Sequence, residues 1–171
     1  MKKKYLYCAT LLAILALSAC SNHPEATADD SSATTTTTSS EITTDEDYFD
    51  ALVAKVETIT TDNYKSDDYL GWDYKTLLRE PNKYFDVKMK LINLKILQVM
   101  DEGKYKKILT VAPNSEYYML FIENKRLETN LLEDDVIFIN GRYMLDYDYT
   151  TISNTAKKVP LVYVDGYLLD K

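Results

Sequence analysis

The sequence predicts a mainly β (α+β) domain, a small closed barrel of five or six strands preceded by one or two short helices. Three observations lead to this prediction. From about residue 85 onward, apolar and polar residues alternate with the period of two that is typical of strands. Turn signals rich in Gly, Asn, Asp or Pro separate these segments. The preceding segment, 48–80, instead has apolar residues at helical spacing.

Two short helices are expected before the first strand. The apolar spacing predicts a helix over 48–58, with Asp45 or Asp47 available as its N-cap. The polar, acidic segment 60–68 that follows is expected to be a loop. A second helix is predicted over 69–80, and the proline after it ends the helix.

The first strand is predicted to be long and bent. Apolar residues alternate with polar ones from Phe85 to Leu91, and the apolar phase then shifts to Leu94 and Ile96. A phase shift inside one strand is what a β-bulge produces. Asn93 lies at the shift, and asparagine tolerates the left-handed backbone that such a bulge requires.

An antiparallel meander is expected next. A hairpin turn at 101–104 leads into a strand over 105–111. A second turn at 113–115 leads into a strand over 117–122. Together with the bent strand, these segments predict three consecutive antiparallel strands.

Two further strands complete the pattern. A connection over 123–132, with room for a helical turn, precedes a buried strand over 136–141 that ends at a glycine. The segment 142–151 continues this strand, and the last strand is predicted over 159–168. A bent strand, a meander, a connector and two closing strands describe a Greek-key barrel of the OB type. The alternative is an open α+β sheet with both helices on one face.

Several segments of this domain also match a family pattern. They are YKTLLREPNKY at 74–84, VKMK at 87–90, ILQVM at 96–100, LLEDDV at 131–136, Asn140-Gly141, Tyr147, Tyr149 and Val159-Pro160. Together they resemble the OB-fold lipoproteins of Gram-positive bacteria over roughly Tyr69 to Leu168. This family is largely uncharacterised, so the resemblance implies the fold and no activity. Asp86 and Asn93 stand where members of the family often have glycine.

The amino terminus predicts export and lipidation. Residues 1–19 carry three lysines and then an apolar run of about a dozen residues, which is typical of a signal peptide and short of the roughly 20 residues that span a bilayer. Leu17-Ser18-Ala19-Cys20 resembles the lipobox of bacterial lipoproteins. Cleavage between Ala19 and Cys20 would leave a diacylglycerol-modified Cys20 as a membrane anchor. An ordinary secretory signal and a retained membrane helix are the alternatives.

The residues left after processing exclude several kinds of chemistry. Cys8 lies within the signal peptide and Cys20 is consumed by lipid, so no disulfide or thiol chemistry is expected. His23, the single histidine, lies three residues from the anchor. We therefore expect no serine-histidine or cysteine-histidine catalysis, no metal site and no cofactor.

Charge divides the chain into a spacer and a domain. Residues 20–47 are rich in Thr, Ser and acids, a composition that predicts disorder, and the folded domain is expected over 48–171. The spacer holds 7 of the 27 acids and the signal 3 of the 20 bases, which leaves 20 acids and 17 bases in the domain. A domain with a net charge of −3 is not expected to bind nucleic acid. We also expect it to be a monomer.

Two groups of side chains are candidate binding residues. Tyr143, Tyr147 and Tyr149 share one face of a predicted strand, where aromatic side chains of OB barrels hold ligands. The alternative is that they cover a half-buried face for structural reasons. No catalytic residue is expected, although a hydrolase that uses Asp134 or Asp135 is a third possibility.

The second group lies on the first hairpin. Lys104, Lys106 and Lys107 cluster there with other lysines and could contact anionic lipid, wall polymer or an acidic partner. The alternative is a solvated strand face whose lysines discourage edge pairing.

These observations predict a non-enzymatic, lipid-anchored binding or interaction module on the extracytoplasmic face of a bacterial cell membrane. Its partner would be an envelope protein, a peptide or a wall polymer. The alternative is a protective lipoprotein that confers immunity to an antimicrobial peptide or excludes phage.

Overall fold

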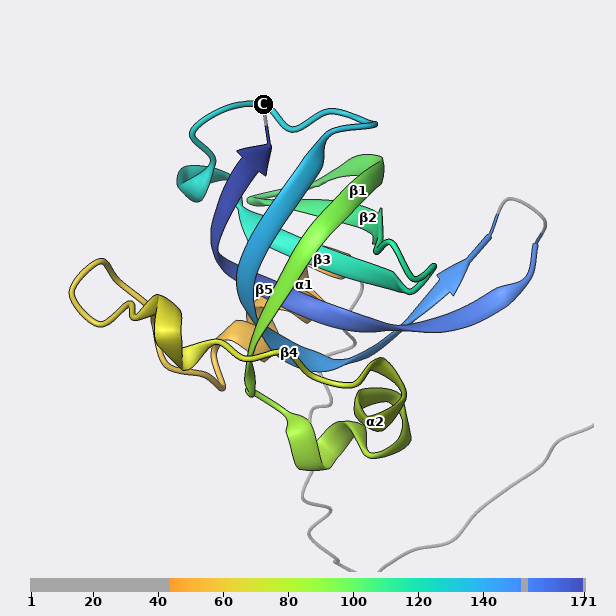
Figure 1. Cartoon of the computed structure of the whole chain (residues 1–171), viewed down its shortest axis with the longest axis horizontal. Helices are drawn as coiled ribbons and strands as arrows, with labels where there is room; N and C mark the ends of the chain where they lie inside the picture. Colours follow the sequence, from red (N-terminus) through yellow and green to blue (C-terminus); the bar gives the residue numbers. More distant parts are fainter. Residues whose placement is uncertain (1–43, 152–153, 171) are drawn as a thin grey trace, which may run out of the picture. The chain divides into compact units, whose positions relative to one another are not determined.

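The computed structural model describes residues 44–151 and 154–170 (Figure 1). The predicted signal peptide and the lipidation site, with Ala19 and Cys20, lie outside the described residues, as does most of the predicted spacer. No described helix is both long and apolar enough to cross a membrane.

The described residues form two α-helices, three short 3-10 helices and five strands. In chain order these are α1 (Asp45–Val53), η1 (Ser66–Asp68), α2 (Tyr74–Arg79), η2 (Pro81–Tyr84), β1 (Lys88–Glu102), β2 (Tyr105–Val111), β3 (Tyr117–Glu123), η3 (Asn124–Arg126), β4 (Val136–Thr150) and β5 (Ala156–Asp170).

The strands close into a barrel in the order β1-β2-β3-β5-β4 (Figure 1). Neighbouring strands are antiparallel except for β3 and β5, which pair in parallel between Met119–Phe121 and Leu161–Tyr163. A three-stranded meander closed by β5 and β4 is the arrangement of the OB fold. The predicted closed barrel is therefore confirmed, and the alternative of an open sheet is wrong.

The bend of β1 lies where the sequence predicts it. The register between β1 and β4 shifts between Leu91 and Leu94, and Asn93 has a φ of 53°. Asp86, just before β1, also has a positive φ, of 65°. Asp86 and Asn93 thus both adopt the left-handed backbone that glycine adopts most readily.

Replacing Asn93 by alanine should lower the free energy of unfolding by about 1 kcal/mol, because alanine tolerates the left-handed backbone less well. Replacing it by glycine should leave stability unchanged or raise it slightly. Asn93 is exposed, so neither change disturbs packing. Chemical denaturation measures both variants. Asn82→Ala, at an exposed position with an ordinary backbone, is the matched control, and an equal loss in the control would contradict the role of Asn93.

The first helix begins earlier than predicted. α1 starts at Asp45, is capped by the hydroxyl of Thr44, which accepts from the Asp47 N–H, and ends at Val53. Three acidic residues in its first turn stabilise it because they face the positive end of the helix dipole. The composition of the segment assigned these three acidic residues to the spacer, but they belong to helix α1.

The second helix is shorter than predicted. α2 covers Tyr74–Arg79, whereas the preceding residues are extended, and Leu70 forms a parallel bridge with Met89 of β1. Pairing with the barrel thus overrides the local helical spacing. Leu77 of α2 is completely buried and packs into the barrel interior.

The core has two parts on opposite faces of the strands. One fills the barrel interior and contains apolar residues from all five strands. The other lies outside, where α1 covers the outer face of β2, β3 and β5. Phe49 of α1 stacks on Phe121 of β3, with ring centroids 4.3 Å apart, and meets Tyr105 of β2 edge-on.

Candidate functional site

The face that OB barrels commonly use for ligands is covered in this protein. Such barrels bind on the outer face of the second and third strands and on adjacent loops. Here Phe49 and Leu52 of α1 occupy that face and are almost completely buried. A ligand can reach the aromatic rings beneath them only if α1 moves.

Three of the predicted binding residues hold α1 in place. Lys107 bonds to Asp45 of α1 and, at 2.6 Å, to Glu102. The hydroxyl of Tyr147 donates to Asp45 over 2.7 Å, and Lys104 pairs with a carboxylate of the same helix, that of Asp50, over 2.7 Å. These side chains fasten the helix instead of facing an open site.

The pKa values reflect these contacts. Burial acts to lower the pKa of Lys107, but its bonds to the two carboxylates more than offset this and raise it. Burial and the hydrogen bond to Asp45 raise the pKa of the Tyr147 hydroxyl to about 12. Both groups therefore keep the protonation state that holds α1 over the neutral pH range.

The predicted common face of the three tyrosines is wrong. The register between β4 and β5 shifts between Tyr143 and Asp146, and Leu145 has a φ of 99°. Tyr143, before this irregularity, lies in the barrel interior, where it is completely buried and its hydroxyl donates to the Leu77 carbonyl over 3.2 Å. Tyr147 and Tyr149 pack against the outer core instead.

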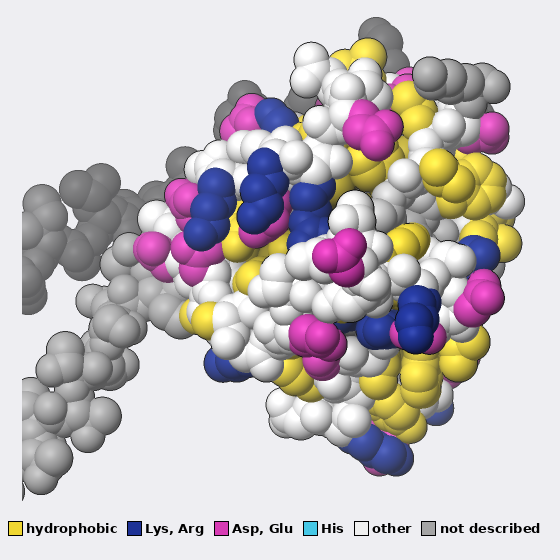
Figure 2. Space-filling view, turned by 90° about the vertical axis from the view of Figure 1, so that its left-hand side faces the viewer, with side chains coloured by type: hydrophobic (Ala, Val, Ile, Leu, Met, Phe, Trp, Pro, Cys, Tyr) yellow, Lys and Arg dark blue, Asp and Glu magenta, His cyan; other side chains and the backbone are white. Residues whose placement is uncertain are grey.

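The lysines do not form an open basic patch. Lys106 pairs with Asp101, and Lys104 and Lys107 pair as described above. Figure 2 shows Lys and Arg side chains beside Asp and Glu side chains, with hydrophobic side chains between them. Paired charges of this kind fit the structural alternative better than they fit an anion-binding surface.

Tyr149 borders a hollow of about 800 Å³ beside the projecting β4–β5 hairpin. Leu97, Tyr117 and Lys157 also line it, and the Lys157 ammonium lies 5.4 Å from the centre of the Tyr117 ring. Of the predicted binding residues, Tyr149 is the one that reaches an open hollow.

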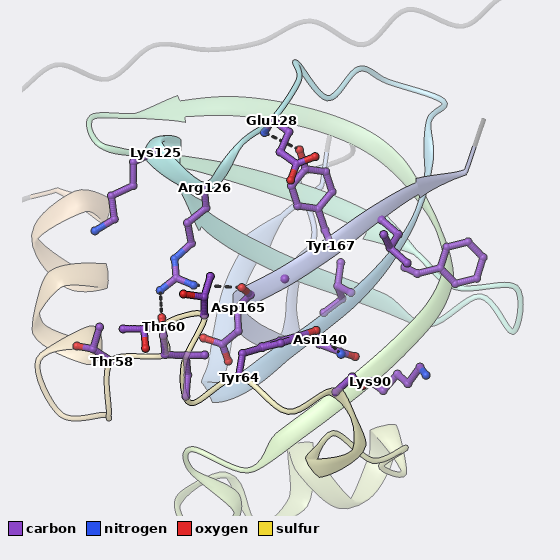
Figure 3. Close-up of a pocket in the computed structure, with 17 residues that line it drawn as sticks. Thr58, Thr60, Tyr64, Lys90, Lys125, Arg126, Glu128, Asn140, Asp165 and Tyr167 are labelled. Carbon is purple, nitrogen blue, oxygen red and sulfur yellow. Dashed lines mark hydrogen bonds between the residues drawn. The ribbon is translucent and has the colours of Figure 1, made fainter.

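A larger cleft, of about 960 Å³, opens on another side of the barrel (Figure 3). The loop 58–66 forms one wall, the connector 125–128 forms another, and the outer surfaces of β4 and β5 form the floor. The floor is apolar around Phe138, Ile139 and Leu168. Leu168 is 72% exposed, which is the largest exposure of a large apolar side chain among the described residues.

Tyr64 is seated in this cleft by a glycine. A Cβ at position 166 would lie 3.1 Å from the Tyr64 hydroxyl oxygen, closer than an ordinary van der Waals contact, so Gly166 lets the ring lie close over β5. The Asn140 side-chain amide donates to that hydroxyl over 2.7 Å. The ring is thereby held against the floor, with its own O–H left to donate to a ligand.

A buried ion pair supports the cleft from beneath. Arg142 donates to both carboxylate oxygens of Asp165, at 3.0 and 2.9 Å, and the Tyr69 hydroxyl donates to the same carboxylate at 3.0 Å. Arg142 and Asp165 are 2% and 9% exposed. Burial raises the pKa of Asp165, and the charge of Arg142 opposes this rise.

Two arginines fix the loop wall to the barrel. Arg142 donates to the Glu57 carbonyl over 2.6 Å. Arg126 donates to the carbonyls of Ile59 and Asp165, each over 3.1 Å (Figure 3). These bonds tie the start of the loop to β4, β5 and the connector, so the cleft exists before any ligand enters.

This cleft was not predicted from the sequence, although one sequence signal indicates the ion pair beneath it. Arg142 follows Gly141 and precedes Tyr143 and Met144, and Asp165 ends the run Leu161 to Val164. A charged residue inside an apolar strand needs a buried partner, because an isolated buried charge is strongly unfavourable. Two such residues in neighbouring strands indicate an ion pair.

The part of the chain that the structure describes contains neither cysteine nor histidine, because Cys8, Cys20 and His23 all precede residue 44. Within that part, no three acidic side chains gather as metal ligands would. The cleft offers instead an apolar floor, hydroxyl and amide groups, and charges at its rim. Such a surface can bind and orient a molecule.

Comparison with known proteins gives a distant likeness. No protein-family model and no curated protein sequence matches the chain. Among solved structures, the barrel is similar to two crystal structures of the mitochondrial single-stranded DNA binding protein Rim1 from S. cerevisiae. One has a TM-score of 0.36 and 12% identity, covering 50% of this chain and 92% of that one. The other has a TM-score of 0.35 and 11% identity, covering 49% and 94%.

This finding contradicts the expectation that nucleic acid is excluded as a partner, because both structures are of DNA-binding proteins. Net charge is a poor guide to this class of partner for a physical reason. Net charge describes a whole domain, whereas an OB barrel binds through one face, whose charge need not follow the net value. The exclusion is therefore withdrawn, and a likeness at this level assigns no ligand to this chain.

Proposed function

We propose that this chain is a lipid-anchored, non-enzymatic binding module on the extracytoplasmic face of a bacterial membrane, and that its ligand occupies the cleft beside Tyr64. The lipobox-like Leu17 to Cys20 supports the anchor. The cleft supports the binding role, and it is the observation that carries the proposal.

The size and construction of the cleft suit a ligand. Its volume of about 960 Å³ lies at the upper end of the range for small-molecule sites, and its lining combines an apolar floor with a few oriented polar groups. The arginine bonds beneath it remove much of the ordering entropy that binding would otherwise cost. A preformed hollow with an apolar floor and oriented hydroxyl and amide groups suits the binding of a ligand.

The distance to the membrane would be short. The structure describes the chain from Thr44 onward, and 23 residues, 21–43, lie between Thr44 and Cys20. For a flexible chain of that length the average end-to-end distance is roughly 25 Å. The ligand would then be a molecule found within a few nanometres of the membrane surface.

One experiment tests both halves of the proposal. Membranes are prepared from cells that express the whole chain, and sedimentation measures how much labelled peptide and glycan, released from purified envelopes of the same bacterium, they retain. We expect wild-type membranes to retain a saturable amount. Cys20→Ser should remove the protein from the membranes, because the thioether cannot form, whereas Cys8→Ser should not.

Leu168→Arg should keep the protein in the membranes and abolish retention, because it places a charge on the apolar cleft floor. Leu132→Arg is the matched control, since Leu132 is 63% exposed but does not line the cleft. Membranes that still hold the Cys20→Ser protein would overturn the anchor. Unchanged retention by Leu168→Arg would overturn the cleft as the site.

A further inference from the structure

The charges that line the cleft divide into paired and unpaired groups. Lys125 and Arg126 both pair with Glu123, at 2.9 and 3.2 Å. Asp165 is neutralised by Arg142. Two exposed charges are left, Lys90 and Glu128, and neither forms an ion pair with any other residue that the structure describes.

These two charges are opposite in sign and lie on separate parts of the cleft. Lys90 projects from β1, whereas Glu128 belongs to the connector that follows η3 (Figure 3). They do not pair with each other, so the cleft presents one cationic and one anionic point with an apolar floor between them. A ligand that matches both points carries a separated positive and negative charge.

The surface between the two charges limits which class of ligand can bind. Phe138 and Leu168 offer contact to apolar groups. The hydroxyl of Tyr64 accepts from Asn140, which leaves the Tyr64 O–H as a donor and the Asn140 amide oxygen as an acceptor. A peptide main chain supplies both an acceptor and a donor, and its side chains supply apolar surface.

Other ligand classes match less of this surface. A polymer with charges of one sign would place like charge beside either Lys90 or Glu128. An acyl chain would leave both charges and the polar pair without partners. A short peptide with free ends satisfies every group.

Building on the proposed function, we propose that the cleft binds a short, extended peptide of a few residues, with its cationic amino end at Glu128 and its anionic carboxyl end at Lys90. The partner is thus a short free peptide, and the two unpaired charges set its direction in the cleft.

The test uses the whole chain with Cys20→Ser in neutral detergent and follows backbone amide signals by NMR. Four pools of random pentapeptides are titrated, with free ends, with an acetylated amino end, with an amidated carboxyl end, and with both ends blocked. The free pool should shift the signals around Tyr64, Lys90, Glu128 and Asn140. Each blocked end should weaken binding about two- to five-fold, as expected for the loss of one exposed ion pair.

Charge variants assign the direction. Lys90→Glu should abolish the preference for a free carboxylate and keep that for a free amine, and Glu128→Lys should do the reverse. Lys75→Glu is the matched control, since Lys75 is exposed on α2 and does not line the cleft. Equal binding of all four pools, or unchanged preferences in both variants, would overturn the inference.

A second titration separates this inference from the proposed function. Glycan fragments from purified envelopes are added to the same chain. Shifts around the cleft with glycan and none with any peptide pool would leave the binding role in place and overturn the peptide assignment. No shift around the cleft with either probe would overturn both.

Discussion

Replacing Arg142 by leucine will lower the free energy of unfolding by about 3 to 5 kcal/mol, the usual cost of removing one partner of a buried ion pair. Arg142 is 2% exposed and makes two bonds to Asp165. Without it, the carboxylate of Asp165 would remain buried with the Tyr69 hydroxyl as its hydrogen-bond donor and without its ion-pair partner. Denaturant unfolding followed by fluorescence of Trp72 measures the loss.

Two further variants show whether the charge is the cause. Arg79→Leu removes an exposed arginine from α2 and should change stability by no more than about 0.5 kcal/mol. Adding Asp165→Asn to Arg142→Leu should restore part of the loss, because a neutral amide needs no counter-charge. If the double variant is no more stable than Arg142→Leu, the loss arises from packing and the ion-pair explanation is wrong.

Replacing Phe49 by alanine will weaken the docking of α1 by about 3 to 5 kcal/mol, as for other fully buried aromatic side chains. Phe49 is completely buried and stacks on Phe121, which in turn stacks on Tyr163 with ring centroids 5.0 Å apart. A helix of nine residues is not stable alone in water, so α1 depends on this contact. Hydrogen exchange at the α1 amides should therefore become much faster.

Phe49→Leu is the control for this prediction, because it keeps an apolar side chain between α1 and the sheet. We expect it to lose about 1 to 1.5 kcal/mol. Amides of the barrel interior, such as those of Leu120 and Val162, should stay protected in both variants if α1 opens on its own. Wild-type exchange rates in α1 of Phe49→Ala would show that its acidic residues alone hold the helix.

The barrel was predictable because its signals are local. The phase shift at Asn93 indicates the bulge of β1, and the turn residues at Gly103 and Pro113 set the meander. Each signal lies within a few residues of the feature it specifies, and pairing of neighbouring strands follows from it.

The positions of the side chains around the site were not predictable in the same way. Alternation along β4 places Tyr143 beside Tyr147, but the irregularity at Leu145 depends on packing against β5. From the sequence, Lys107 is expected on a solvated strand face. In the structure it is buried, and it pairs with Asp45, which lies 62 residues earlier in the chain. Contacts between segments far apart in the sequence determine these side-chain positions, so no local sequence pattern predicts them.

The barrel cannot close until its last strand, β5, is in place between β3 and β4. β5 pairs with β4 over most of its length and with β3 in parallel, so until β5 joins, the barrel has an open seam. The parallel contacts join residues about 40 positions apart, and pairings of such separation form slowly during folding. Asp165, Gly166 and Leu168 lie in the same strand. A chain that lacks β5 therefore has neither a sealed barrel nor the β5 part of the cleft floor.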